Sequence, residues 1–132
     1  MAAKLTPEQE VIAREEKLAM MAAIRKDGSA QLTPINYVYD DGVFLISTTR
    51  DRAKYHNVKR NPKVSLCIIR PEWRPYLTVY GTARVEEVDI VEGTAKIYRH
   101  MTGNANTPDG FADALKQQKR VLIILTPEQL SP

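Results

Sequence analysis

Hydroxyl and basic side chains crowd together between Ser47 and Pro62, where the sequence reads STTRDRAKYHNVKRNP. Three hydroxyl residues, Ser47 to Thr49, follow the apolar run VFLI and precede the basic segment. If that segment is a helix that follows a strand, its free N-terminal N–H groups and the positive end of its dipole lie beside the hydroxyls. With an added ammonium group, these donors are suited to bind a phosphate.

The spacing of three residues in this segment supports the same interpretation. Arg50, Lys54 and Asn57 are related as i, i+4 and i+7, which predicts that they share one face of the helix. The alternative is purely structural: Thr49 caps the helix and the basic side chains face water. Composition alone does not choose between the two.

Positive charge is concentrated around the same helix. Residues 50–74 contain eight of the 19 basic residues and two acidic ones. This window therefore carries +6 and the rest of the chain −3, against a total of +3. Such local asymmetry attracts anionic ligands even when the whole protein is nearly balanced.

The sequence lacks the motifs of several common enzyme classes. It contains no GxGxxG, GxxxxGK or GxSxG pattern, which are typical of dinucleotide, nucleotide and hydrolase sites. His56, His100 and Cys67 do not have the spacing of a zinc site. Cys67 lies within VSLCII, which favours a packed thiol over a nucleophile. If the chain is an enzyme, we expect a cofactor to supply the chemistry.

Length and composition predict one globular domain that spans residues 1–132. A single cysteine cannot form an internal disulfide, which is typical of a reducing cytoplasm. No segment approaches the ~20 apolar residues that span a bilayer, and MAAKLTPEQE lacks the apolar centre of a signal peptide. We therefore expect a soluble, cytoplasmic protein.

Short strands are the main elements that must position these residues. Residues 76–85 alternate strictly between apolar and polar side chains, a period of two, and Asp40-Asp41-Gly42 predicts a hairpin. The predicted strands are residues 18–26, 30–39, 43–48, 64–70, 76–85 and 121–125. Closure into a small barrel would remove exposed strand edges.

Helices are predicted between these strands and before them. The first runs from about residue 6 to 17, with Thr6 and Gln9 as a capping box and Pro7 at its first position. A second covers residues 51–60. A third opens with a capping box of Asp89 and Glu92 and stops at Gly103, and a short fourth covers residues 111–118.

The order of these elements and their motifs resemble the FMN-binding split β-barrel superfamily, which includes pyridoxamine-phosphate oxidase. The resemblance is closer to the branch that uses the deazaflavin coenzyme F420. It is carried by IRKDGSAQLTPINYVYDDGVFLISTTRDRAKYHNVKRNPKVSL and YLTVYGTARV. It implies a mainly β (α+β) fold: a six-stranded antiparallel split β-barrel with short inserted helices. It also implies a homodimer that holds its cofactor in the cleft between subunits.

The resemblance also implies which residues bind the cofactor. Ser47 and Thr48 match positions that bind its phosphate, and Lys54 matches the phosphate-binding lysine. The segment from Thr33 to Asn36 matches the edge along the flavin ring. Tyr76 matches a position that reaches the cofactor from the partner subunit. The predicted cofactor-binding residues are Thr33, Pro34, Ile35, Asn36, Ser47, Thr48, Thr49, Arg50, Arg52, Lys54, Asn57, Trp73 and Tyr76.

Two departures argue against the oxidase activity itself. The oxidases have an arginine immediately before the phosphate lysine, where this chain has Ala53. They also end in a basic, histidine-containing segment, whereas this chain ends in LTPEQLSP. Extra arginines suit the acidic tail of F420, a phosphate followed by glutamates. They are Arg50, Arg52, Arg60, Arg70 and Arg74.

The sequence therefore predicts an F420-dependent reductase that transfers a hydride to a small unsaturated acceptor, with no catalytic side chain assigned. One alternative is the same fold holding FMN, or carrying a flavin or tetrapyrrole without turnover. A single-stranded nucleic-acid-binding barrel, using Trp73, Tyr76 and Tyr80, is disfavoured. Aromatic residues make up only 7% of the chain, and the basic charge lies on one short helix.

Overall fold

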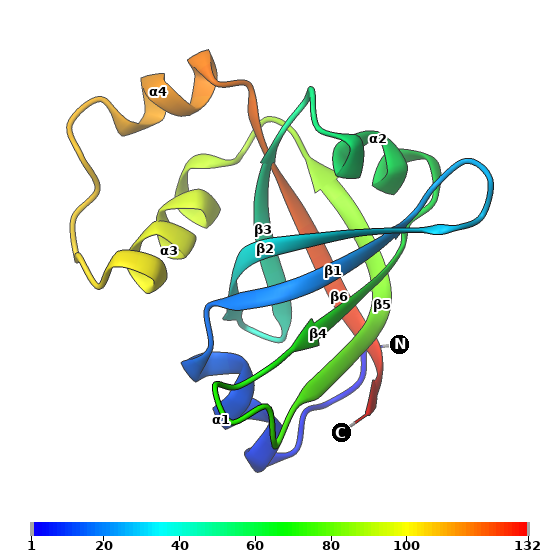
Figure 1. Cartoon of the computed structure of the whole chain (residues 1–132). Coiled ribbons are helices and arrows are strands. Elements are labelled where there is room, and N and C mark those ends of the chain that lie inside the picture. The colour runs from blue at the N-terminus through cyan, green and yellow to red at the C-terminus, as the bar shows by residue number, and fades with distance from the viewer. Residues whose placement is uncertain (1, 132) are drawn as a thin grey trace.

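Six antiparallel strands close into one barrel in the computed structural model, which describes residues 2–131 (Figure 1). The strand order around the barrel is β1-β2-β3-β6-β5-β4. The strands are β1 (Leu18–Ile24), β2 (Ala30–Asp40), β3 (Val43–Thr49), β4 (Lys63–Ile68), β5 (Leu77–Glu86) and β6 (Arg120–Ser131). The predicted mainly β, six-stranded antiparallel fold is confirmed.

Four helices lie outside the barrel in the part of the chain that the structure describes. They are α1 (Pro7–Glu15), α2 (Ala53–Arg60), α3 (Val91–Thr102) and α4 (Phe111–Gln117). As predicted, the inserted helices follow the third and fifth strands: α2 connects β3 to β4, and α3 and α4 together connect β5 to β6 (Figure 1). None of the helices described in residues 2–131 is long and apolar enough to cross a membrane.

The barrel interior is filled by the apolar side of each strand. On β5, Leu77, Val79 and Ala83 are buried while Tyr80 and Thr82 are exposed, as the alternation of the sequence predicts. Every strand contributes to this core, whose fully buried members include Met21, Tyr37, Phe44, Ile46, Leu66, Ile68, Leu77, Val79, Ile123 and Leu125. The core thus holds the strands in the register that presents the site.

A second apolar cluster fixes α3 and α4 to the outside of the barrel. Leu45 of β3 and Leu122 of β6 point outward and pack against Ile90, Ile97 and Leu115. Side chains alternate across a strand, so β3 can bury Phe44 and Ile46 inside the barrel while Leu45 serves this outer cluster. The two helices are therefore packed on a sheet face that also borders the site.

The predicted N-terminal cap is present in α1 and absent in α3. Thr6 and Gln9 form the predicted capping box of α1, although this helix ends at Glu15 rather than near residue 17. The capping box predicted for Asp89 is wrong, because the N-cap of α3 is Ile90, which makes no side-chain cap bond. The backbone N–H of Asp89 instead donates to the Glu86 carboxylate at 3.2 Å.

Strand β6 is longer than the predicted residues 121–125. Its first half pairs with β3 on one side and β5 on the other, and its continuation to Ser131 pairs with β5, with a register shift between Tyr80 and Gly81. The polar residues and Pro127 in LTPEQLS do not read as a strand, because proline within a sheet is confined to edges and irregular pairings. Here it lies beside such an irregularity, opposite Gly81.

Candidate functional site

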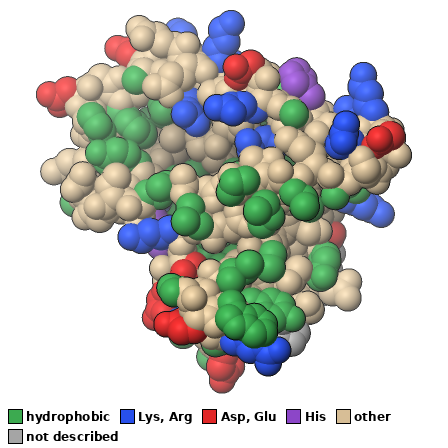
Figure 2. Space-filling view, viewed as in Figure 1, with side chains coloured by type: hydrophobic (Ala, Val, Ile, Leu, Met, Phe, Trp, Pro, Cys, Tyr) green, Lys and Arg blue, Asp and Glu red, His purple; other side chains and the backbone are tan. Residues whose placement is uncertain are grey.

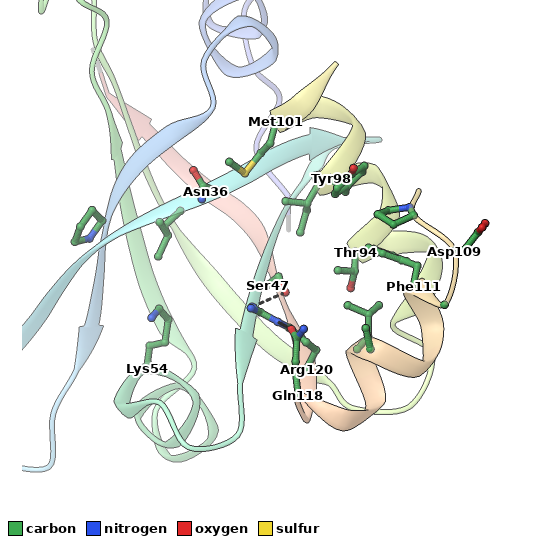
Figure 3. A pocket seen from close by; sticks show the side chains of 17 residues that line it. Asn36, Ser47, Lys54, Thr94, Tyr98, Met101, Asp109, Phe111, Gln118 and Arg120 are labelled. Atoms are coloured by element: carbon green, nitrogen blue, oxygen red, sulfur yellow. Dashed lines mark hydrogen bonds between the residues drawn. The ribbon is translucent and has the colours of Figure 1, made fainter. Parts of the chain in front are cut away.

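A cavity of about 500 Å³ lies between the outer face of the barrel and helices α3 and α4 (Figure 3). The barrel side of this pocket contributes Pro34–Asn36 of β2, Ser47 of β3 and Arg120 of β6, and α2 contributes Lys54. The helical side contributes mostly apolar residues, which include Ile97, Tyr98, Met101, Phe111, Ala114 and Leu115. We refer to it below as the α3–α4 pocket.

The polar and apolar groups of the α3–α4 pocket are segregated. In Figure 3, Lys54, Ser47 and Arg120 lie toward the barrel side, while Met101 and Phe111 lie along the helices. An apolar wall with a few convergent polar groups is typical of sites for organic ligands. The arrangement therefore suits a molecule with a flat or apolar body and an anionic group.

Lys54 is the most unusual side chain in this pocket. It lies in the first turn of α2 and is only 9% exposed. Burial lowers its pKa, and the nearby charges of Arg52 and Arg120 lower the pKa further, with no acceptor in the described chain to offset them. Its ammonium group makes no hydrogen bond within the described chain and faces the pocket, so an anion bound there would gain a charge-assisted hydrogen bond.

Arg120 and Ser47 lie on the same barrel face. Ser47 is an outward-facing residue of β3, and the Arg120 Nη1 donates to its Oγ at 3.4 Å. The Arg120 Nε donates to the Oε1 of Gln118 at 2.9 Å. Arg120 is not among the residues predicted from sequence, since it stands before an apolar run that indicates only a core strand. The sequence signal that could have identified it is an arginine at the first position of such a strand.

Five of the predicted residues come together in the α3–α4 pocket: Pro34, Ile35, Asn36, Ser47 and Lys54. Thr33, the neighbour of Pro34, is not among its lining residues, and its hydroxyl accepts a hydrogen bond from Gln31 at 3.3 Å.

Thr48 lies apart from Ser47 despite their adjacency in sequence. It is 3% exposed and alternates with Ser47 along β3, so its side chain points to the opposite side of the strand. Of the two hydroxyls matched to phosphate-binding positions, only that of Ser47 lines the α3–α4 pocket. The assignment of Thr48 stays a prediction from the resemblance.

The residues before α2 do not adopt the predicted helical arrangement. The helix begins at Ala53, with Arg52 as an N-cap that makes no side-chain cap bond, so both the capping role of Thr49 and the shared face of Arg50 with Lys54 and Asn57 are wrong. The Thr49 hydroxyl donates to Asp51 instead. The backbone is extended at Arg52, and this turns the preceding residues away from the helix axis.

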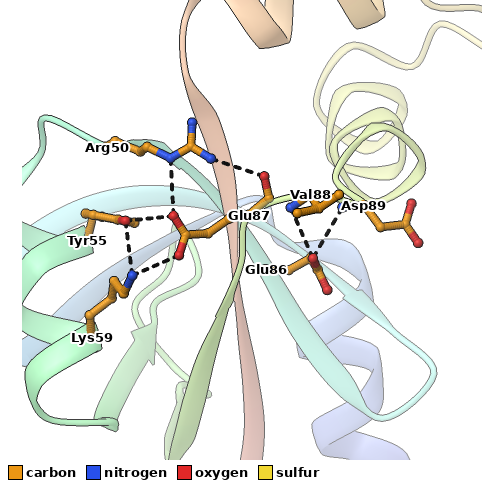
Figure 4. A network of polar contacts seen from close by, with 7 residues as sticks. All are labelled: Arg50, Tyr55, Lys59, Glu86, Glu87, Val88 and Asp89. Carbon is orange, nitrogen blue, oxygen red and sulfur yellow. Dashed lines mark hydrogen bonds and ion pairs between the residues drawn. The ribbon is translucent and has the colours of Figure 1, made fainter.

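Arg50 is engaged within the chain. Its guanidinium donates to the Glu87 carboxylate and to the Glu87 carbonyl, both at 3.2 Å (Figure 4). Asn57 is engaged too: its amide donates to Gln31 at 2.9 Å and accepts from Arg60 at 2.6 Å. Their predicted roles toward a cofactor therefore remain predictions.

Other basic residues of the 50–74 window also have internal partners. Arg70 forms an ion pair with Glu15 at 2.9 Å, and the Arg74 guanidinium lies 4.3 Å from the centre of the Trp73 ring. The positive charge that is available for a ligand is thus smaller than the sequence count indicates.

Trp73 and Tyr76 lie in the connection between β4 and β5, outside the α3–α4 pocket of their own chain. Trp73 is 57% exposed and Tyr76 is 36% exposed. The resemblance places Tyr76 at a cofactor of the partner subunit, so its role stays a prediction that requires a dimer.

The sequence profile of the pyridoxamine 5'-phosphate oxidase family matches residues 5–132. The chain belongs to this family. Its structure is similar to that of an F420 reductase, with 25% identity and a TM-score of 0.77, over 96% of this chain and 98% of the other.

Two structures with lower sequence identity also share this fold. A conserved hypothetical protein from Mycobacterium tuberculosis has 19% identity and a TM-score of 0.82, over 98% of this chain and 84% of the other. The heme storage protein HutZ from Vibrio cholerae has 23% identity and a TM-score of 0.74, over 98% and 94%. The resemblance to the split-barrel superfamily is confirmed.

Proposed function

We propose that this member of the pyridoxamine 5'-phosphate oxidase family is an F420-dependent reductase that acts on a small unsaturated acceptor. The observation that carries this proposal is the α3–α4 pocket, in which Ser47 and Lys54 lie with Pro34–Asn36 from β2, and Lys54 has no acceptor within the described chain. The similarity to an F420 reductase over nearly the whole of both chains supports the same choice.

The pocket residues fit the chemical parts of such a cofactor. Lys54 and Ser47 would bind its phosphate, since a charged donor beside a hydroxyl is an effective phosphate receptor. Pro34–Asn36 would lie along the ring. A reduced deazaflavin supplies a hydride when it is bound, so the protein is left with positioning and with exclusion of water. Met101 and Phe111 serve the second task as apolar lining.

The complete site is proposed to need a second subunit. The outer face of β1 and β2 exposes Leu18, Met20 and Leu32, and Pro34 stands opposite Met20 in the pairing of the two strands. Figure 2 shows hydrophobic side chains on the face where these strands cross in Figure 1. Pro34 belongs to both this face and the pocket, so a partner bound here would border the cofactor.

Titration with purified F420 and with FMN tests the proposal. We expect F420 to bind and to be turned over with an unsaturated acceptor, and Lys54→Ala to weaken binding by about 10- to 100-fold through the loss of a charge-assisted hydrogen bond. Lys116→Ala is the matched control, because Lys116 is exposed on α4 and does not line the pocket. Tight FMN binding without F420 binding would reject F420 in favour of FMN.

A further inference from the structure

Lys54 and Arg120 are two cations of one pocket with no carboxylate between them. Lys54 makes no hydrogen bond to an acceptor in the described chain. The hydrogen bonds of the Arg120 side chain within residues 2–131 are to neutral groups, Ser47 and Gln118. Asp109 also lines the pocket, but in Figure 3 it lies at the far end beside α4. Elsewhere on the surface, Arg50 is paired with a carboxylate.

The proximity of two positive charges, Lys54 and Arg120, has an energetic cost. Arg120 contributes to lowering the pKa of Lys54, which means that the two charges repel each other through the pocket. Repulsion between charges grows as water is excluded. A shared anion would turn this repulsion into attraction for both side chains.

Arg120 is held in place before any ligand binds. Its Nε is fixed by Gln118 at 2.9 Å, and its backbone lies opposite Thr49 in the β3–β6 pairing. The preceding carbonyl, of Lys119, accepts from the Arg50 N–H at 3.2 Å. A planar guanidinium fixed in this way loses little freedom when it binds an oxyanion.

We propose that Arg120 binds the same anion as Lys54, so that Lys54, Arg120 and the Ser47 hydroxyl form a three-point seat for a tetrahedral phosphate group. A phosphate monoester and a phosphate diester share this chemistry. The identity of the molecule that carries the phosphate rests on the proposed function, whereas the seat itself does not.

The test compares Arg120→Gln and Arg120→Lys with Lys116→Gln, which removes one exposed positive charge from the neighbouring helix. Isothermal titration with pyrophosphate probes the seat, and titrations with F420 and FMN probe the two cofactor sources. Near-native circular dichroism and Tm of each variant establish that it is folded.

We expect Arg120→Gln to weaken binding of the phosphate-bearing probes by about 10- to 100-fold. Arg120→Lys should restore part of this loss and Lys116→Gln should change affinity less than about twofold. Arg120→Gln should also move the loss of the remaining affinity to higher pH, because Lys54 then lacks a repelling neighbour. A purely structural role of Arg120 would not produce that shift.

The possible failures are distinguishable. Pyrophosphate binding that depends on Arg120 without any F420 binding refutes the proposed cofactor and supports the seat. Unchanged affinity of folded Arg120→Gln for pyrophosphate and for the bound cofactor overturns the seat, as does a wild-type protein that binds neither phosphate nor cofactor.

Discussion

The ammonium group of Lys54 is the proposed main contact for an anion in the α3–α4 pocket. Its side chain is nearly buried, and burial followed by the charges of Arg52 and Arg120 lowers its pKa below the ordinary value of 10.5. The charged form of Lys54 is therefore less favourable in the free protein than that of an exposed lysine. Binding an anion should raise the pKa of Lys54 and draw a proton onto the side chain at alkaline pH.

The affinity for phosphate-bearing ligands should consequently fall as the pH rises through the lowered pKa of Lys54. The sign follows because the anion binds the protonated form, which the free protein loses at a lower pH than an exposed lysine does. Titrations between neutral pH and pH 10.5 check this expectation. Lys54→Arg, which stays charged over the whole range, should show a flat profile. A wild-type affinity that does not change over this range would contradict it.

At this scale the structure brings together some of the residues that the sequence predicts and separates others. Ser47 and Lys54 were placed by the resemblance, and the structure brings both to one pocket. Thr48 was grouped with Ser47, although adjacent strand residues point to opposite sides. Arg50 was assigned to a helix that begins three residues later. Arg120 was missed because its distance in sequence hides the β3–β6 pairing that places it near Ser47.

At the scale of elements, Glu87 connects α2 to the end of β5. Its carboxylate accepts from the Tyr55 hydroxyl at 2.7 Å, from Lys59 at 2.9 Å and from Arg50 at 3.2 Å (Figure 4). These hydrogen bonds, with that of Lys59 the largest, lower the pKa of Glu87 to about 2. The carboxylate thereby helps to fix the helix that carries Lys54.

Glu87→Gln should lower the Tm by a few degrees at neutral pH, with a smaller effect in acid. Because the folded-state pKa is depressed, the stabilisation is present above the ordinary value of 4.5 and is lost as the pH falls toward 2. Thermal unfolding of the variant and wild type over this range measures the difference. Glu72→Gln is the control, since Glu72 lies exposed in the β4–β5 connection. An equal Tm difference at pH 7 and pH 2.5 would argue against this role.

Gly81 determines how closely β5 and β6 approach each other. A Cβ at this position would lie 2.0 Å from the carbonyl oxygen of Thr126, which is backbone and cannot rotate away. Gly81→Ala should therefore destabilise the protein by about 3 kcal/mol or more. In Gly93→Ala the new Cβ meets only the flexible end of Leu122, at 2.5 Å. Chemical denaturation should separate the two variants clearly; similar stabilities would contradict the close approach.

Local sequence patterns predict the elements that do not depend on contacts with distant parts of the chain. The α1 cap was predicted from Thr6 and Gln9, and the β5 strand from its alternation. Asp89 had the same local pattern and does not cap α3, because the packing of Ile90 in the outer apolar cluster sets where that helix begins. The second half of β6 depends on pairing with β5, which no local pattern reports.

At the scale of the whole molecule, the exposed apolar face of β1 and β2 predicts association. Leu32 is 66% exposed, and an aspartate there would place a charge in the proposed interface. We expect a dimer in light scattering with size-exclusion chromatography, and a shift of Leu32→Asp toward monomer with weaker cofactor binding. Val88→Asp is the control, since Val88 is exposed outside the strands. A wild-type monomer that binds the cofactor fully would exclude the shared site.

The barrel as a whole was predictable, whereas the pocket was only partly so. The six predicted strands and the turn at Asp40–Gly42 specify a closed antiparallel barrel once the resemblance supplies their order, although β6 is longer than predicted. The helices between β5 and β6 were predicted as elements, but their position was not. That position depends on which outward side chains of β3 and β6, such as Leu45 and Leu122, provide an apolar surface for them.

The two walls of the α3–α4 pocket belong to different kinds of structure. One wall is the barrel, whose order depends on contacts between strands far apart in sequence. The other is a single continuous insertion between β5 and β6, two strands that already pair with each other at Glu86 and Leu122. Exchange of residues 88–117 would therefore leave the barrel's hydrogen bonding and the Gln118–Arg120 contact intact while it reshapes the space above Ser47 and Lys54. Ligand choice can thus diverge through one exchangeable segment while phosphate binding is inherited with the barrel.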